Sequence, residues 1–311
     1  MARGYEPSAS AHSIVVVKKV ALIVNPFSTG VTESRLQAVE QELGRFARVE
    51  TLPTARGGHA VELARAASYE NDAILVFSGD GVFNEVLNGL DCPIPVGFIP
   101  GGRTNVLPRS LGLPRAPVAA ARQIGEALAA ERTRTISLGR VNGRRFGFGA
   151  GVGADAELIR RIDERGRTHD GRLPGDLAVA RLFLRQLAAR RGRYEPALEI
   201  EGVGRAAFAL VANGDPYTYA GAVGLRFVPD AQFELGLDFV APVAVRARTF
   251  ATIAARAVRG RVHEEFLYGH DLDRIDIVCD SPMPLQVDGE DLGDVTEAHF
   301  ECERGAVAVV V

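Results

Sequence analysis

The sequence is poor in cysteine, with three residues in 311. Cys92, Cys279 and Cys302 are widely spaced, and none of them belongs to a C-x-x-C pair. An odd number of distant cysteines argues against a disulfide framework and against a zinc site. We therefore expect a protein of a reducing compartment, the cytoplasm.

Long hydrophobic runs are also missing. Lys18 and Lys19 separate the apolar residues 14–17 from the apolar residues 20–24, so both runs are too short for a signal peptide or a membrane-spanning helix. Residues 1–13 are small and polar without periodicity, and we expect them to form a loose tail. Any membrane contact is then predicted to be peripheral.

No charge of one sign dominates the chain. The formal net charge is -3, which does not favour a nucleic-acid partner. Hydrophobic residues make up 47% and charged residues 24%, as in soluble globular proteins, and the length is sufficient for two domains. Since no repeat or low-complexity linker is evident, we place the domain boundary where the pattern changes: 14–135 and 136–311, with a last strand that could return to the first domain.

Residues 73–90, AILVFSGDGVFNEVLNGL, organise the first domain. The pattern predicts a buried strand, a glycine turn and an amphipathic helix. The unpaired N–H groups at the start of a helix attract anions, and glycines let a phosphate approach the backbone. Asp80 could then bind magnesium. The alternative is a tight connection in which Asp80 only caps the helix.

The same alternation recurs from residue 20 to residue 131. It predicts a parallel sheet with helices on both faces. Turns at the carboxyl ends of parallel strands line one crevice, so we expect NPFSTG (25–30), SGDG (78–81) and PGGRTN (100–105) to converge. The predicted strands are 20–24, 48–52, 73–77 and 96–99. One predicted helix begins at Thr32, and two others span 57–70 and 117–131.

From about residue 135 the pattern is richer in short strands, which indicates antiparallel sheets arranged as a β-sandwich. Helices are expected at 176–191 and 243–258. Arginines concentrate between residues 155 and 193, either as a solvated face or as a contact for anionic lipid headgroups. The predicted strands are 135–141, 145–150, 197–201, 206–213, 237–241, 263–268, 274–279, 285–287, 297–302 and 307–311.

A strand and a turn with two carboxylates, LQVDGE, occupy residues 285–290. A kinase that acts on an alcohol needs a carboxylate near the acceptor hydroxyl, and Asp288 is our candidate for this general base. Taken alone, the segment has the sequence of an ordinary hairpin turn.

The order of these motifs resembles the diacylglycerol kinase catalytic-domain family, soluble bacterial lipid kinases related to sphingosine kinases. The resemblance extends from about residue 20 to residue 311, and its most specific part is S-G-D-G-x-x-N-E-V-L-N-G-L followed far downstream by V-D-G-E. GAGVGADAE, at residues 149–157, also looks like a family segment.

The resemblance implies an α/β nucleotide-binding domain, like that of phosphofructokinase and NAD kinase, and a β-sandwich domain, with the active site between them. It implies ATP and Mg²⁺ as cofactors, a diacylglycerol-like lipid as substrate, a peripheral membrane surface as partner and no nucleic acid, with a homodimer among the states considered. By the resemblance Asp288 and Glu290 are catalytic and Asp80 binds the metal. The ATP site is assigned to Asn25, Gly79, Asp80, Gly81, Gly102, Thr104 and Asn105, with Glu85 in the same block.

Several positions depart from the family pattern. Ser78 and Val82 replace a glycine and a threonine, and Val106 replaces an aspartate in a turn that has gained Arg103. Leu235 replaces an aspartate that helps to bind a structural magnesium in some members. Two alternatives therefore stay open: a homologue that binds nucleotide or lipid with impaired catalysis, and a kinase of a small soluble alcohol such as NAD.

Overall fold

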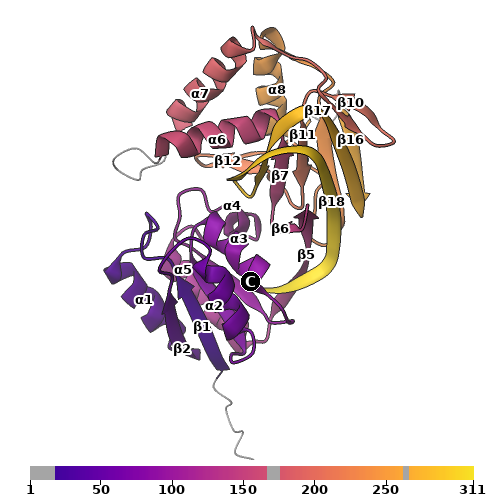
Figure 1. The fold of residues 1–311 in the computed structure, drawn as a ribbon. Coiled ribbons are helices and arrows are strands. Elements are labelled where there is room, and N and C mark those ends of the chain that lie inside the picture. Colours follow the sequence, from indigo (N-terminus) through magenta and orange to yellow (C-terminus); the bar gives the residue numbers. More distant parts are fainter. Residues whose placement is uncertain (1–17, 167–175, 262–265) are drawn as a thin grey trace, which may run out of the picture.

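The computed structural model describes residues 18–166, 176–261 and 266–311. The predicted tail and part of the predicted strand 263–268 lie outside these residues. Strands and helices alternate through the first region, as predicted (Figure 1). Its elements are β1 (Lys18–Val24), α1 (Glu33–Leu43), β2 (Ala47–Pro53), α2 (His59–Ala67), β3 (Ala73–Ser78), α3 (Asp80–Gly89), β4 (Val96–Pro100), α4 (Val106–Ser110) and α5 (Pro117–Ala129).

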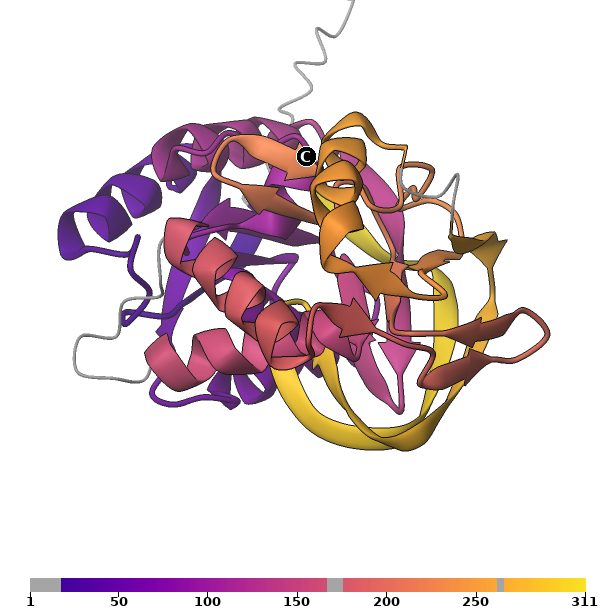
Figure 2. The same cartoon turned by 90° about the horizontal axis from the view of Figure 1, so that it is seen from above.

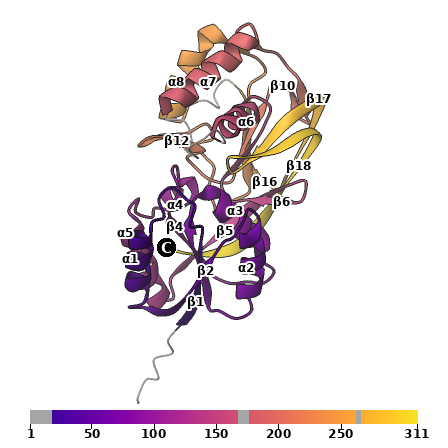
Figure 3. The same cartoon turned by 60° about the vertical axis from the view of Figure 1, so that its left-hand side comes forward.

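The first four strands form a parallel sheet in the order β4-β3-β1-β2. Alternate side chains of β1 enter the two cores on opposite faces of the sheet, Ala21 and Ile23 on one face and Leu22 on the other. The first core is shared with α2 and α3, and the second with α1 and α5 (Figure 3). The prediction of helices on both faces is confirmed.

The second region is largely antiparallel. No helix in the described residues is long and apolar enough to cross a membrane. The elements are β5 (Thr133–Val141), β6 (Arg144–Phe146), β7 (Gly149–Val152), α6 (Ala154–Gly166), α7 (Asp176–Ala189), β8 (Arg193–Tyr194), β9 (Leu198–Ile200), β10 (Gly204–Ala206), β11 (Ala209–Ala212), β12 (Thr218–Ala220), β13 (Val223–Leu225), β14 (Leu237–Ala241), β15 (Val245–Arg246), α8 (Ala247–Arg259), β16 (Leu267–Leu272), β17 (Arg274–Val287) and β18 (Glu290–Val310).

The long strand β18 connects the two regions. It pairs antiparallel with β17 and with β5, and near its end Val309 pairs with Val96 of β4 in parallel (Figure 1). One sheet therefore continues from β16 to β2. The predicted boundary at residues 135 and 136 falls inside β5, which is itself paired with β18.

Several predicted elements differ from those observed. The strands predicted at 274–279 and 285–287 are one strand, β17, with a shift of register between Val278 and Met283. Likewise β18 continues through the predicted gap between 302 and 307. The strands predicted at 145–150 and 206–213 are each divided into two. Helices α4 and α6 were not predicted.

Candidate active site

The turns that follow β1, β3 and β4 are in contact, as predicted. The Gly30 N–H donates to the Gly101 carbonyl at 2.8 Å, and the Gly101 N–H donates to the Ser78 carbonyl at 2.6 Å. The hydroxyls of Ser28 and Ser78 are 2.8 Å apart. Ser78, which replaces a family glycine, is thus fully buried and joins the first turn to the second.

Two of the predicted site glycines, Gly79 and Gly102, pack closely against each other through their backbones. A Cβ atom on Gly102 would lie 2.5 Å from Gly79 Cα, closer than side chains allow. By contrast, no atom lies within 4 Å of a Cβ placed on Gly81. Gly79 and Gly102 therefore hold the turns together, whereas Gly81 faces open space at the start of α3.

The Asp80 carboxylate lies at the first residue of α3 and caps a different helix. Its oxygens accept hydrogen bonds from the Val106 and Leu107 N–H groups at 3.0 and 3.3 Å, at the start of α4. The alternative that Asp80 caps its own helix is wrong, because Gly79 occupies that position and no side chain caps α3. The pKa of Asp80 is raised to about 7, because burial and, to a smaller extent, the charge of Asp288 outweigh the backbone donors, which lower it.

Asn25, Thr104 and Asn105 serve mainly to shape the turns. Asn105 Oδ1 accepts from the Gly102 N–H and its Nδ2 donates to the Gly102 carbonyl, both at 2.8 Å. Asn25 Oδ1 accepts from the Phe27 N–H at 2.9 Å. The Thr104 carbonyl accepts from Arg109 Nη1 at 3.3 Å. These hydrogen bonds stabilise the conformation of the turns after β1 and β4.

Asp288 comes from the second region and reaches the first. It lies in the turn between β17 and β18 with a φ of 49°, and 5% of it is exposed. The backbone N–H groups of residues 147–149 donate to its carboxylate at 2.7, 3.0 and 3.1 Å, and Asn84 Nδ2 of α3 donates at 2.8 Å. Burial raises the pKa of Asp288, although all four donors act to lower it.

Asn84 is the residue that the sequence reasoning missed. It is buried, and its amide donates to the Arg145 carbonyl at 2.9 Å as well as to Asp288. One turn further along α3, Asn88 Oδ1 accepts from the Arg145 N–H at 2.9 Å. The signal was two asparagines four residues apart, on one face of the helix that follows the glycine turn.

Glu290 and Glu85 add negative charge near Asp288. Glu290 forms an ion pair with Arg144 at 3.1 Å, and burial together with the charges of Glu85 and Asp288 raises its pKa. Glu85 accepts from the N–H groups of Gly58 and Ala60 at 2.9 and 3.1 Å, so it also caps α2. The electrostatic environment between the two regions is therefore acidic.

The described residues fit a magnesium ion that is held partly by phosphate. They contain no group of three or more His, Cys, Asp or Glu side chains that could form a metal cage. Asp80 offers one carboxylate, and magnesium in kinases needs only one or two in addition to phosphate oxygens and water. The residues present therefore suit a magnesium ion that is also bound by the phosphates of a nucleotide.

The structural magnesium of some family members does not fit this chain. Leu235 has no ligand atom in its side chain, and Glu234 is paired with Arg134. Nearby, Arg304 Nη1 lies 2.8 Å from Asp271. Guanidinium groups therefore already neutralise the carboxylates around residues 234–236.

The family model for the Diacylglycerol kinase catalytic domain matches residues 19–141. A diacylglycerol kinase of Mycobacterium tuberculosis is 32% identical over 243 residues, which are 71% of this chain and 72% of that protein. The chain belongs to the diacylglycerol kinase catalytic-domain family. By class it is a lipid kinase.

One further relative is similar in sequence along most of this chain, and two solved structures are similar in fold. A diacylglycerol kinase of Bacillus subtilis is 29% identical over 289 residues, covering 88% of this chain and 90% of the relative. A diacylglycerol kinase structure from Bacillus anthracis has a TM-score of 0.71 at 21% identity, covering 94% of this chain and 96% of that one. An NAD kinase of Archaeoglobus fulgidus in complex with ATP reaches a TM-score of 0.52 at 15% identity, with 94% and 93% covered. The predicted fold class is confirmed.

Proposed function

We propose that this family member transfers the γ-phosphoryl group of ATP to the hydroxyl of a diacylglycerol-like lipid. One observation carries the proposal: Asp288 of the second region is buried against α3, the helix that begins at Asp80. The names of the relatives support a lipid acceptor of this kind. The acceptor would bind at the second region and the nucleotide at the turns of the first.

The ATP site that we propose is formed by the turns after β1, β3 and β4. Gly81 leaves open space at the start of α3, where unpaired N–H groups and the helix dipole favour phosphate. Gly79, Gly102 and Asn105 hold the neighbouring backbone, with Asn25 and Thr104 shaping the turns on either side. Asp80 would hold magnesium, which offsets the charge of the phosphates when it is bound.

Asp288 is the proposed general base. It takes the proton of the lipid hydroxyl as the hydroxyl oxygen bonds to the γ-phosphorus, while the bond from phosphorus to the β–γ bridging oxygen breaks and ADP leaves. Each carboxylate oxygen already accepts two hydrogen bonds. Because three of these donors are backbone groups, we propose that the hydroxyl displaces the fourth, the Asn84 amide. Glu290, two residues after Asp288, forms an ion pair with Arg144.

We also propose that the protein acts in the cytoplasm at a membrane surface. Its substrate class resides in membranes, and its three cysteines are all free thiols. The proposed site needs no second copy of the chain, because Asp80, Asn84 and Asp288 all come from one chain.

Incubation of the protein with labelled ATP, magnesium and a mixed lipid extract tests the proposal, with NAD and other water-soluble alcohols assayed in parallel. We expect label in a diacylglycerol-like lipid only. Asp288→Asn should lower kcat by about 10²- to 10⁴-fold, the usual contribution of a general base. Asp294→Asn is the matched control, because Asp294 lies on the same hairpin and contacts Arg160.

The two alternatives predict other outcomes. Label in NAD but not in lipid would indicate a kinase of a soluble alcohol. Tight ATP binding without any transfer would indicate the catalytically impaired homologue. Full activity of Asp288→Asn with an unchanged melting temperature would remove Asp288 from the mechanism.

A further inference from the structure

Arginine is unevenly distributed over the surface of this acidic chain. No Asp or Glu occurs between residues 177 and 194 or between residues 239 and 261, which contain all of α7 after Asp176, all of α8, and the adjoining strands β8 and β15. Six exposed arginines in these segments form what we call the basic face: Arg181, Arg185, Arg191, Arg193, Arg246 and Arg248.

The segments of the basic face are adjacent in space. Leu187 of α7 and Ile253 of α8 pack into the same hydrophobic cluster. Helices α6, α7 and α8 lie together on the second region, at the top of Figure 1 and toward the viewer in Figure 2. Strand β8 pairs with β15 so that Arg193 is directly opposite Arg246. Two like charges in such a cross-strand pair destabilise the folded state unless an anion is nearby.

No carboxylate of the described residues supplies that anion. None of the six guanidinium groups forms an ion pair within the part of the chain that the structure describes. Several arginines elsewhere form ion pairs, for example Arg160 with Asp291 and Arg226 with Asp215, at 2.8 and 2.6 Å. The basic face is therefore a region of uncompensated positive charge.

Apolar side chains are exposed among these arginines. Leu184 on α7 is 55% exposed and Val258 on α8 is 50% exposed. A nucleic acid would use the charge but not the aliphatic groups. A bilayer surface uses both, because arginine binds anionic headgroups while aliphatic side chains enter the boundary of the acyl region.

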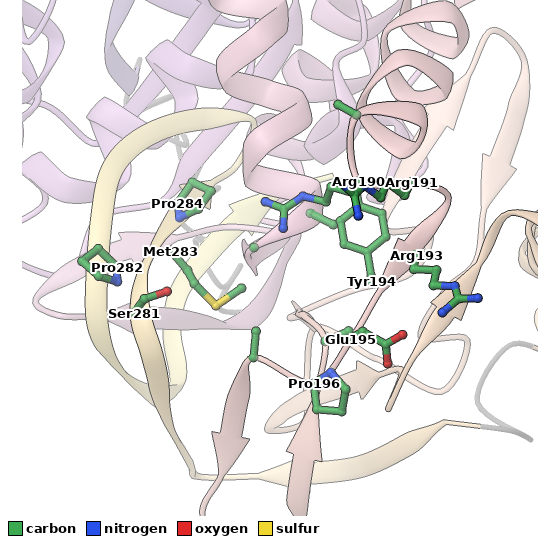
Figure 4. Close-up of a pocket in the computed structure, with 15 residues that line it drawn as sticks. Arg190, Arg191, Arg193, Tyr194, Glu195, Pro196, Ser281, Pro282, Met283 and Pro284 are labelled. Atoms are coloured by element: carbon green, nitrogen blue, oxygen red, sulfur yellow. The ribbon is translucent and has the colours of Figure 1, made fainter.

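A pocket of about 500 Å³ borders the basic face (Figure 4). Three arginines and one carboxylate line it, Arg190, Arg191, Arg193 and Glu195, so positive charge is in excess, and Met283 and Pro284 of β17 line the opposite wall. The pocket therefore suits an anionic lipid, whose headgroup would contact the arginines and whose apolar part would contact Met283 and Pro284. Helices α7 and α8 likewise expose both arginine and aliphatic side chains.

We infer that the basic face docks the protein on an anionic lipid bilayer. The inference rests on the proposed function only in that the substrate is a membrane lipid. Beyond that function, it identifies the surface that contacts the membrane and predicts a preference for anionic over neutral membranes.

Sedimentation with sucrose-loaded vesicles tests the inference on the full chain without ATP. The vesicles contain either phosphatidylcholine alone or phosphatidylcholine with one third phosphatidylglycerol. We expect partition onto the anionic vesicles only, and its loss in concentrated salt. Each arginine near the surface contributes about fivefold to the partition coefficient, so Arg181→Gln/Arg185→Gln and Arg246→Gln/Arg248→Gln should each weaken it by about 25-fold.

The control is Arg48→Gln/Arg132→Gln, which changes the net charge equally on the first region, where both side chains are exposed. It should shift the partition by less than about twofold. Equal loss for all three variants, no loss for the basic-face variants, or equal binding to neutral vesicles would overturn the inference. Stronger binding to a duplex RNA than to vesicles would assign the face to nucleic acid instead.

Failure of the inference can be distinguished from failure of the proposed function. Phosphorylation of a short-chain diacylglycerol below its micelle concentration needs no bilayer. If the wild type phosphorylates it while the basic-face variants bind vesicles normally, only the docking surface is wrong. If the wild type binds anionic vesicles but phosphorylates no lipid, only the proposed function is wrong.

Discussion

The glycines of the nucleotide-side turns differ in what they do, although the motif presents them as equivalent. Gly102 lies against the backbone at Gly79, while Gly81 has no neighbour at its Cβ position. The first kind of glycine is needed for the fold of the turns. The second kind is needed only if a ligand occupies the adjacent space.

Two alanine substitutions separate these requirements. Gly102→Ala should lower the melting temperature because its methyl group would overlap the Gly79 backbone. Gly81→Ala should leave the melting temperature unchanged or slightly higher, since alanine favours a helix by about 1 kcal/mol, but should weaken ATP binding. Calorimetry of unfolding and titration with ATP measure the two effects. Equal melting temperatures for both variants would contradict this distinction.

His270 makes the stability of the second region depend on pH. Its Nδ1 lies 2.8 Å from the buried carboxylate of Asp238, which raises the pKa of His270, with smaller contributions from Asp230 and Asp271. Because the folded state favours the protonated ring, the stabilisation is complete below the unfolded pKa of about 6.5 and is lost as the pH rises through the higher folded pKa.

The corresponding prediction compares wild type with His270→Gln. The difference in unfolding free energy should be largest near pH 6 and should decrease toward pH 9. The side chain is 41% exposed, so we expect a change of less than about 1 kcal/mol. Urea titrations at four pH values measure it. A difference that increases with pH would contradict the assigned ion pair.

At the scale of elements, the short helix α4 and the hairpin β12–β13 join the two regions beside Asp80. The Arg109 guanidinium lies 3.4 Å from the centre of the Tyr219 ring, and its Nη2 donates to the Gly221 carbonyl at 3.2 Å. Arg109 Nη1 also donates to the Thr104 carbonyl in the turn before α4. The contact therefore links the hairpin to a turn of the proposed ATP site.

A double-mutant cycle tests this link. Arg109→Gln and Tyr219→Leu should each raise KM for ATP several-fold, and together little more than either alone, because they remove the same cation–π contact of about 0.5–2 kcal/mol. Tyr219→Phe keeps the ring and is the control. Fully additive effects on KM would show that the two residues act separately.

The sequence predicted those helices and strands that a short, continuous residue pattern encodes. The alternation of β1 to α5 was evident because β1, β3 and β4 contain short apolar runs and the long helices have an apolar stripe. Helix α6 was missed because its sequence, ADAELIRRIDERG, is mostly charged. Strand β17 was divided because Pro282 and Pro284 normally interrupt strands, whereas here the register shifts past them.

The candidate site was predictable only in part. Convergence of the three turns follows from parallel topology and was predicted, while the roles of their residues stay predictions. The capping of α4 by Asp80 and the bond from Asn84 to Asp288 were not foreseen, since the second joins residues 204 positions apart. No local pattern encodes such a contact, and only the folded sheet brings the partners together.

At the scale of the molecule, β18 should make unfolding cooperative. The strand is hydrogen-bonded to β17 in the second region and to β4 in the first. Neither region can therefore lose its sheet without exposing buried backbone of the other. We expect one calorimetric transition with equal calorimetric and van't Hoff enthalpies. Two separate transitions would show that the regions unfold independently.

Strand β18 also determines when this protein can finish folding during its synthesis. The ribosome produces β4 more than two hundred residues before it produces Val309, the partner of Val96. Until then the nascent chain carries a sheet with an open edge, a state that pairs readily with foreign strands. Translation must therefore run through residues 290–310 before the nucleotide half is closed, and truncated products that end earlier retain that reactive edge.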